Sequence, residues 1–345
     1  PQAAQDVLDE MENEGWATAI AYGLVLRGWR ELATRKSSSS NQSNGFLSEI
    51  AEKSLDLLHR MEQRKIATPV AYTTVMGVVG LAAAAKTRGQ AAQQVQDLLN
   101  RMKEYDSSMI NVQTLNVVIQ AWVQAGDMER AEEILREMEE GETTAAGVVG
   151  GLRGVKPDSV SYSTVMNGYV DSSIPDRWDR LESLWHRLEH RYEALGDENC
   201  RPTRVTYTIR MLSYCAAERL DEAEQLIFQL YDRYQKDPHP DAQPNTYMVA
   251  SMLKAWSKSG RSDAGTRAEA LLAWMLDIYR QHPDATWRPN EYTFATAIAT
   301  WSRSRSLGKA MRARKLLEQM KDLYSEGILE AGPNVFCYTG VLTAC

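Results

Sequence analysis

Residues 112–138 read VQTLNVVIQAWVQAGDMERAEEILREM, and this stretch decides the fold. Gly126-Asp127 divides it, because glycine interrupts helices and aspartate favours their starts. The second half carries small or apolar residues at offsets of 0, 3, 4 and 7, a spacing that places them on one helical stripe. The stretch therefore predicts two helices joined by a short turn. The stripe consists of Ala131, Ile134, Leu135 and Met138.

The same stripe recurs along the whole chain, and its final residues lie 36 to 50 positions apart. Recurrence at such a period is typical of repeat proteins, in which each unit is one supersecondary element. The other copies are Ala4-Val7-Leu8-Met11, Ser54-Leu57-Leu58-Met61, Val95-Leu98-Leu99-Met102, Leu181-Leu184-Trp185-Leu188, Ala223-Leu226-Ile227-Leu230, Ala268-Leu271-Leu272-Met275 and Ala313-Leu316-Leu317-Met320.

A second motif precedes most stripes and consists of two apolar, usually aromatic, residues seven positions apart. Seven residues make two helical turns, so each pair lies on one face of a first helix, helix A, and the stripe belongs to helix B. The pairs are Tyr22/Trp29, Tyr72/Val79, Leu115/Trp122, Tyr162/Tyr169, Tyr207/Tyr214, Val249/Trp256 and Phe294/Trp301.

Neither helix buries its stripe alone, so we predict an all-α fold, an α-solenoid of stacked helix–turn–helix units forming one array over residues 1–345. The stretches 37–45 and 141–154 are rich in Ser, Asn or Gly, and we expect mobile loops there. The units are 19–68, 69–111, 112–158, 159–203, 204–245, 246–290 and 291–334, with a leading helix B at 1–18 and the opening of another helix A at 335–345.

The composition restricts the function classes. Apolar residues make up 43% of the chain and charged residues 25%, as in an ordinary folded protein. The longest small or apolar run, Gly77 to Ala85, is too short to span a bilayer, so we expect no membrane partner. The four cysteines form no CxxC pair and predict reduced thiols. Pro1 and Cys345 both lie inside helical patterns, so we expect a piece of a longer protein that lacks any targeting segment.

Two motifs suggest other chemistry. His186-Arg-Leu-Glu189-His190 has the H-x-x-E-H form of a zinc protease helix, but it lies on a helix B and no third ligand accompanies it. The stretch Gly147 to Gly154 lacks the spacing of a phosphate-binding loop. We therefore expect no enzyme, metal, cofactor or small-molecule substrate in these residues.

The stretch quoted first, together with PNTYMVASMLKAWSKSG (244–260) and PNEYTFATAIATWSRS (289–304), resembles pentatricopeptide repeats. Tetratricopeptide repeats are the nearest alternative, and their Trp-Leu-Gly-Tyr pattern is absent. The units here have 42 to 50 residues, against about 35 in the family. We expect the extra length in the A–B turn and mostly after helix B.

The resemblance implies a right-handed superhelix whose A helices line the concave side and bind single-stranded RNA, about one base per repeat. In the family, the fifth residue of helix A and the last residue of the same unit read one base, which here predicts any-A-U-any-A-any-any. Gly23, Ala250 and Ala295 offer no polar side chain, so their bases should be poorly discriminated. The pairs are Gly23/Thr68, Thr73/Asn111, Asn116/Asp158, Ser163/Thr203, Thr208/Asn245, Ala250/Asn290 and Ala295/Asn334.

The family's second position holds bases between apolar side chains, and Gln113 is the exception here. Simpler roles remain open for these residues. Asp158, Asn245, Asn290 and Asn334 are also good helix caps, and two tyrosines of the second position can pack between units instead. The second-position residues are Ile20, Val70, Val160, Val205, Tyr247 and Tyr292.

The net charge of −7 conceals an asymmetry between the two kinds of helix. The seven helix-A segments carry a balance of +10, and the remainder, rich in acidic helix-B residues, carries −17. We expect the A helices to bind phosphates, although a solvated mixed face is the simpler alternative. The predicted phosphate contacts are Arg27, Arg30, Arg210, Lys254, Lys258 and Arg303.

The leading functional hypothesis is sequence-selective binding of single-stranded RNA. The resemblance implies an organelle, mitochondrion or plastid, and a role in RNA processing, stabilisation, editing or translation. Two alternatives stay open. One is a protein-binding scaffold, favoured by the acidic charge and the three non-polar reading positions. The other is the RNA-recognition arm of an enzyme whose catalytic domain lies outside these residues.

Overall fold

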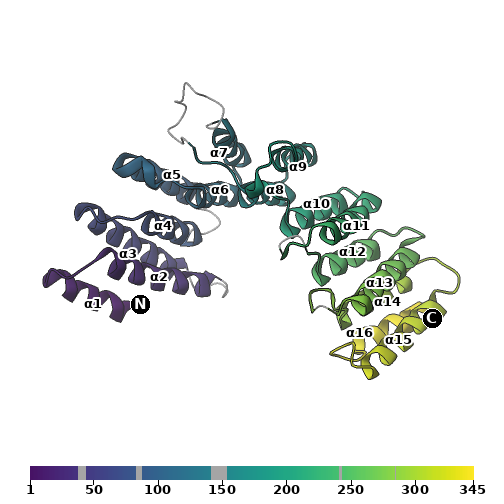
Figure 1. Ribbon diagram of the computed structural model, residues 1–345. Helices are drawn as coiled ribbons and strands as arrows, with labels where there is room; N and C mark the ends of the chain where they lie inside the picture. The colour runs from purple at the N-terminus through teal and green to yellow at the C-terminus, as the bar shows by residue number, and fades with distance from the viewer. Residues whose placement is uncertain (38–43, 83–87, 141–153, 241–242, 284) are drawn as a thin grey trace. The chain divides into compact units, whose positions relative to one another are not determined.

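The computed structural model describes residues 1–37, 44–82, 88–140, 154–240, 243–283 and 285–345. Within these residues all regular elements are helices, and none is a strand. Helices A and B alternate in chain order, which confirms the predicted α-solenoid class (Figure 1). Of the two predicted loops, residues 38–43 and 141–153 lie outside the described part, while Ser37 ends one helix and Asn44 begins the next.

Each helix A begins directly after a residue that can cap it. Cap side chains accept hydrogen bonds from first-turn amides, which otherwise have no partner. The helix therefore starts at a position set by the local sequence. The A helices are α2 (Ala19–Ser37), α4 (Pro69–Ala82), α6 (Val112–Ala125), α8 (Ser159–Asp171), α10 (Arg204–Ala216), α12 (Thr246–Lys258), α14 (Glu291–Arg303) and α16 (Val335–Ala344).

Helix B accounts for much of the extra repeat length. In six units it has 17 to 20 residues, against 13 in the helix that carries the first-quoted stripe. Part of the extra length therefore lies within helix B itself, because continuous stripes allow the helix to extend. The B helices are α1 (Gln2–Asn13), α3 (Asn44–Gln63), α5 (Arg88–Asp106), α7 (Met128–Glu140), α9 (Arg177–Glu193), α11 (Leu220–Lys236), α13 (Ala264–Gln281) and α15 (Lys309–Ser325).

The predicted stripes form the core. Every residue of the seven stripes after the first is at most 6% exposed, so the stripes meet neighbouring helices along their whole length. Burying one Leu or Met side chain stabilises the fold by roughly 2 kcal/mol relative to exposure. The stripe of α1 differs, since Leu8 is buried while Val7 is exposed. Gly126, in the left-handed region at φ 83°, ends α6 at the predicted turn.

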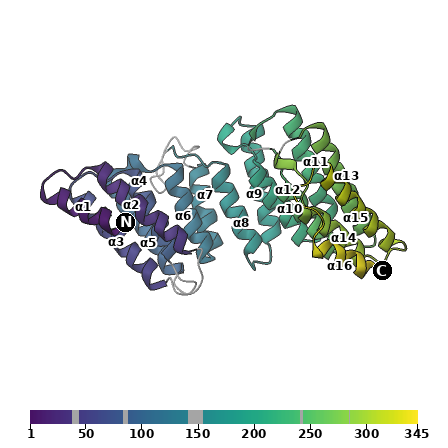
Figure 2. The same cartoon turned by 90° about the horizontal axis from the view of Figure 1, so that it is seen from below.

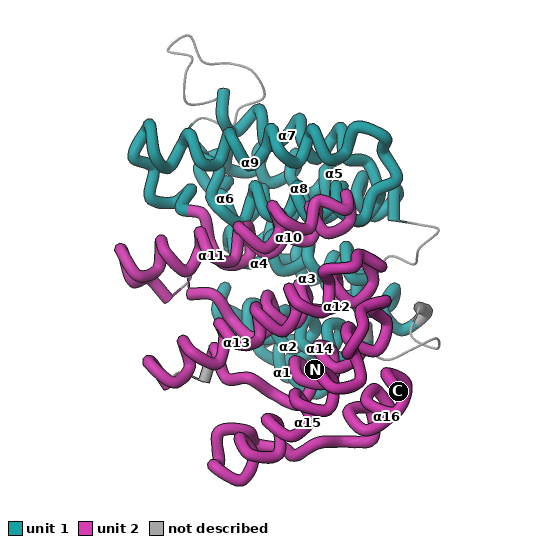
Figure 3. The backbone as a smooth tube through the Cα atoms, turned by 90° about the vertical axis from the view of Figure 1, so that its right-hand side faces the viewer, with its two compact units in different colours: residues 1–201 teal, residues 202–345 magenta. Residues whose placement is uncertain are grey.

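The described residues form two compact units, Pro1–Arg201 and Pro202–Cys345 (Figure 3). In unit 1, α6, α7 and α8 lie side by side (Figure 2) and α2 packs on α4. In unit 2, α12 packs along α14, and α14 along α16. The boundary lies close to the end of the fourth predicted repeat, whose last residue, Thr203, belongs to unit 2. The single array over 1–345 and its handedness stay predictions.

Candidate nucleic-acid interface

The last residue of each predicted repeat caps the following helix A. Asn111 Oδ1 accepts a hydrogen bond from the Thr114 amide at 2.9 Å, and Asn290 Oδ1 accepts one from the Thr293 amide at 3.0 Å. The capping role that the sequence left open is therefore confirmed. The same role falls to Thr68, Asp158, Thr203, Asn245 and Asn334.

Capping uses only one of the two polar groups of an asparagine side chain, the Oδ1 acceptor. Asn245 and Asn290 accept through Oδ1, and their Nδ2 groups donate to no other residue in the part of the chain that the structure describes. An amide Nδ2 can donate to an acceptor on a base edge. The structure thus leaves these two caps able to contact a ligand.

In unit 1 one predicted reading pair is in direct contact. Asn116 Nδ2 donates to Asp158 Oδ1 at 3.1 Å. The Ser161 hydroxyl, one turn into α8, donates to Asn116 Oδ1 at 2.6 Å and also lies 3.0 Å from Asp158 Oδ1. These bonds hold both side chains in one arrangement and leave Asp158 Oδ2 without a recorded donor among the described residues.

A second pair in unit 1 is connected through an intermediate residue. The Thr73 hydroxyl donates to the Pro69 carbonyl at 2.7 Å and also lies 3.3 Å from the Thr114 hydroxyl, which donates to Asn111 Oδ1 at 3.1 Å. In both cases the fifth residue of one helix A contacts a hydroxyl at the third position of the next, and that hydroxyl contacts the cap. We call this arrangement the cap relay: Thr73–Thr114–Asn111 and Asn116–Ser161–Asp158.

The other fifth positions make no such contact within their units. Gly23 has no side chain, the Thr208 hydroxyl donates to the Arg204 carbonyl at 2.6 Å, and Ala295 packs against the core. Ala250 is 8% exposed, so its methyl group belongs to the core and the predicted base contact there is not supported. Ser163 donates to the Val160 carbonyl, and its predicted partner Thr203 belongs to the other unit.

The second positions carry exposed apolar side chains in each of the two units. Each is at least 49% exposed, and both tyrosines are accessible, which argues against the alternative that they pack between repeats. Phe336, at the second position of α16, is 78% exposed as well. Phe336 was not predicted as a site residue, although the repeat pattern assigns it that position. We call these residues the outer row: Ile20, Val70 and Val160 in unit 1, and Val205, Tyr247, Tyr292 and Phe336 in unit 2.

Caps and the outer row meet at a pocket in unit 2. Asn245, Tyr247 and Asn290 line a space of about 350 Å³ between the first turns of α12 and α14. Arg288 and Glu291 are also among its lining residues, and neither was predicted from the sequence. Three predicted site residues from successive repeats therefore surround one pocket.

The predicted phosphate contacts differ in how available they are. Lys254 and Lys258 are exposed, and no carboxylate pairs with them in the described residues. Arg27 is also exposed, but its Nε lies 3.4 Å from Glu31 Oε1. Arg303 donates to the Ser257 hydroxyl at 2.7 Å.

The remaining two predicted phosphate contacts are Arg210 and Arg30. Arg210 stacks over the Tyr214 ring at 5.4 Å. It follows Val205 by five residues, which places it about 140° round α10 from the outer row. Arg30 is exposed, and its backbone carbonyl accepts from the Thr34 hydroxyl at 2.9 Å.

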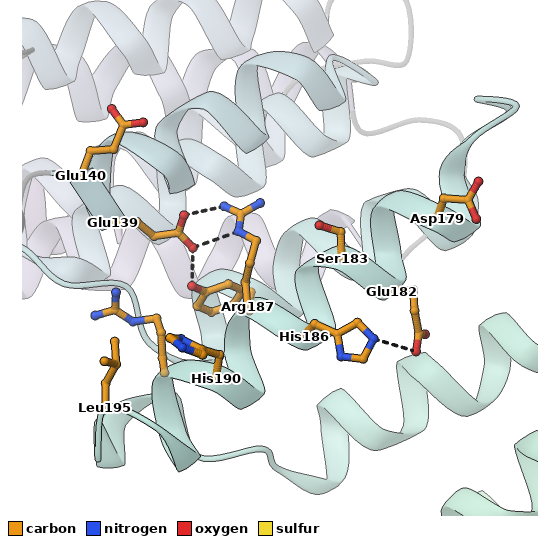
Figure 4. Close-up of a pocket in the computed structure, with 11 residues that line it drawn as sticks. Glu139, Glu140, Asp179, Glu182, Ser183, His186, Arg187, His190 and Leu195 are labelled. Atoms are coloured by element: carbon orange, nitrogen blue, oxygen red, sulfur yellow. Dashed lines mark hydrogen bonds and ion pairs between the residues drawn. The ribbon is translucent and has the colours of Figure 1, made fainter.

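A different pocket, of about 820 Å³, lies in unit 1 and is lined by residues of α7, α8 and α9, among them His186 and His190 of the zinc-like motif (Figure 4). His186 Nε2 lies 3.6 Å from Glu182 Oε1, and His186 Nδ1 lies 3.9 Å from Glu189 Oε2. No group of three metal-ligating side chains occurs among the described residues. Nor does any described helix combine the length and apolarity that a bilayer crossing needs.

Comparisons with known proteins agree with the repeat pattern. A family model described as pentatricopeptide repeat-containing protein matches residues 47–138, and the PPR repeat model matches residues 205–233. Among curated proteins, the small ribosomal subunit protein mL103 (rPPR7) of Arabidopsis thaliana is 21% identical over 225 residues, covering 65% of this chain and 43% of that protein. A pentatricopeptide repeat-containing protein of the same plant is 26% identical over 117 residues, or 34% of this chain and 17% of its own length.

The chain thus spans less than half the length of these two relatives. Among solved structures, the crystal structure of the maize pentatricopeptide repeat protein PPR10 aligns with a TM-score of 0.48 and 20% identity, covering 91% of this chain and 40% of that one. The matched models fall on the helix pairs whose buried stripes and capped A helices define the units. Over residues 47–138 and 205–233 the chain is therefore similar to pentatricopeptide repeats.

Proposed function

We propose that this chain binds single-stranded RNA selectively along its A helices, with the outer row and the caps as contact groups. One observation carries the proposal: apolar side chains at the second position of successive A helices remain exposed beside polar caps. Repeated exposure of large apolar groups is unfavourable in water and marks an interaction surface. Flat apolar and aromatic groups beside hydrogen-bonding side chains suit unstacked bases.

The chemistry divides among three kinds of residue. Outer-row side chains stack on bases, fifth-position and cap side chains hydrogen-bond to base edges, and exposed lysines bind phosphates. The Asn116–Asp158 contact supports a defined reading group at the third repeat, for which the family's pattern gives uracil. The full element any-A-U-any-A-any-any remains part of this proposal. We further propose that the protein is located in mitochondria or plastids, as the family implies.

A protein-binding scaffold is the second candidate function. It is favoured by the net charge of −7 and by one relative's name as a ribosomal subunit protein. In that case the outer row contacts apolar side chains of a partner. A recognition arm for a catalytic domain elsewhere in a longer protein is compatible with either candidate.

The experiment that tests the proposal is selection from a randomised single-stranded RNA pool at moderate salt, followed by sequencing of the bound fraction. We expect enrichment of a short motif with adenine or uracil at the second, third and fifth positions. Duplex RNA of the same composition serves as the competitor and should not displace the bound strand. Failure to enrich any motif would exclude sequence-selective RNA binding.

A further inference from the structure

A pocket of about 530 Å³ lies in unit 2 between α10 and α12, next to the outer row. The apolar part of its lining, which we call the floor, includes Leu212, Leu220 and Ala255, and the polar Ser251 lines the pocket as well. Its rim carries Tyr247, at the outer-row end, and the lysines Lys254 and Lys258 further along α12. The volume lies within the range of about 300–1,000 Å³ that small-ligand pockets occupy.

The pocket exists because the two A helices are not tied together at their C-terminal ends. At the next junction, Arg303 of α14 donates to the Ser257 hydroxyl of α12 at 2.7 Å, and these helices pack closely. Cys215 of α10 and Lys258 of α12 occupy the same two register positions at the open junction. Cys215 Sγ lies 3.9 Å from Met252 Sδ, and contact between α10 and α12 is sparse.

The charges around the pocket favour an anionic ligand. Neither rim lysine has a recorded hydrogen bond or ion pair in the described residues, although the chain carries a net charge of −7. Arg261, the third cation, already pairs with Asp221 at 2.8 Å and with Asp263 at 2.8 Å. Glu218 is the single carboxylate among the lining residues. The two lysines are thus available beside an apolar floor.

We infer that this pocket takes one unread nucleotide of the bound RNA, a spacer between the bases assigned to the fifth and sixth repeats. Its base lies on the apolar floor beside the Tyr247 ring, and its phosphate contacts Lys254 and Lys258. The Ser251 hydroxyl also lines the pocket, but a hydroxyl can both donate and accept, so it does not select one base and all four bases are accepted. The inference rests on the proposed RNA binding and adds a gap to the one-base-per-repeat pattern at this junction.

The test uses the whole chain and the RNA motif selected from the random pool. Each nucleotide of the motif is replaced in turn by the other bases and by an abasic residue, and affinity is measured by fluorescence anisotropy. We expect one position, between the fifth and sixth read bases, where all four bases bind within about twofold. An abasic residue at that position should weaken binding about tenfold, because one stacked base is lost.

A paired substitution closes the pocket while keeping its charge. Cys215→Ser with Lys258→Arg introduces the residue pair that ties α12 to α14. We expect the abasic penalty at the spacer position to disappear in this variant. As a second variant, Ser251→Phe fills the pocket from α12, and Thr296→Phe at the same register of α14 is its control. Ser251→Phe should abolish the penalty, whereas Thr296→Phe should leave it unchanged.

The outcomes separate the two hypotheses. If the read bases of the selected RNA are contiguous and no position accepts all four bases, the hypothesis of a spacer nucleotide is wrong. The proposed RNA binding is not affected by that result. An abasic penalty that persists in folded Cys215→Ser/Lys258→Arg and Ser251→Phe also overturns the spacer nucleotide. Absence of any enriched RNA overturns both the spacer and the proposed function.

Discussion

The two units place different chemistry on equivalent positions of their A helices. In unit 1 the outer row is aliphatic, and hydroxyls at the third position connect Thr73 and Asn116 to the next caps. In unit 2 the row contains Tyr247, Tyr292 and Phe336, and the third position of α12 is Met248, which has no hydroxyl. Unit 1 therefore fixes polar reading groups, whereas unit 2 exposes aromatic rings and lysines. Under the proposed RNA binding, we expect unit 1 to contribute base discrimination and unit 2 to contribute binding strength, so the two can be tested separately.

The largest expected effect concerns the aromatic part of the row. Tyr247→Ala with Tyr292→Ala should weaken binding of the selected RNA about 100-fold, since each aromatic–base stack contributes roughly 1–3 kcal/mol. Val70→Ala with Val160→Ala in unit 1 should weaken binding less than about fivefold, because a valine gives a base little stacking area. Equal losses in the two variants, measured by anisotropy, would show that the two units do not differ in this way.

The next effect concerns phosphate binding by unit 2. Lys254→Glu with Lys258→Glu should weaken binding about 20-fold for every sequence alike, because phosphate contacts carry no base information. The dependence of affinity on salt should become shallower as well. Lys315→Glu, an exposed lysine of α15, is the control and should change little. A loss restricted to particular sequences would instead assign these lysines a reading role.

A third change tests base reading in unit 1. Asn116→Thr with Asp158→Asn keeps a cap on α8 but alters the reading pair. The preference at the third base should move from uracil to adenine by about tenfold, the discrimination of one good base contact. Competition between the two RNAs measures it. An unchanged preference would mean that Asn116 and Asp158 serve the structure alone.

A smaller difference between the units is expected in the stability that each cap contributes to the fold. Asp158→Ala removes the acceptor for the Ser161 amide and for Asn116, so the free energy of unfolding should fall by about 1 kcal/mol or slightly more. Asn290→Ala removes a cap outside any cap relay and should cost somewhat less. Urea unfolding gives the total, and amide exchange in the first turns of α8 and α14 localises it. A larger loss for Asn290→Ala would contradict a stabilising role for the relay.

The smallest effect is confined to alkaline pH. The buried Tyr169 donates to Glu132 at 2.6 Å, and burial together with this bond raises the Tyr169 pKa to about 12. The unfolded tyrosine loses its proton first, near pH 10, so the stabilisation is complete below pH 10 and is lost as pH rises towards 12. At pH 10.5 the loss should be below about 1 kcal/mol. In urea unfolding, the Tyr169→Phe variant should not show this loss of stability at alkaline pH, whereas Tyr207→Phe in unit 2 should still show it.

Much of the fold was accessible from local patterns. The stripe Ala268-Leu271-Leu272-Met275 is buried as its 3.6-residue periodicity predicts, and Asn290 caps the next helix as its residue type predicts. The ends of helix B could not be predicted, because the stripe marks which face is buried and not where the helix ends. Phe336 was missed because the repeat that contains it is incomplete in this chain.

The sequence by itself determined the helices, their caps, the repeat period and the exposed second positions, because these depend on residues within a few positions of one another. Only the tertiary structure decided which side chains meet across neighbouring A helices. It brings Asn116 to Asp158, buries Ala250, joins Arg303 to Ser257 and leaves Lys258 beside an open pocket. These contacts depend on how closely successive A helices pack, and that distance is set by whole helix surfaces and not by any short stretch of sequence.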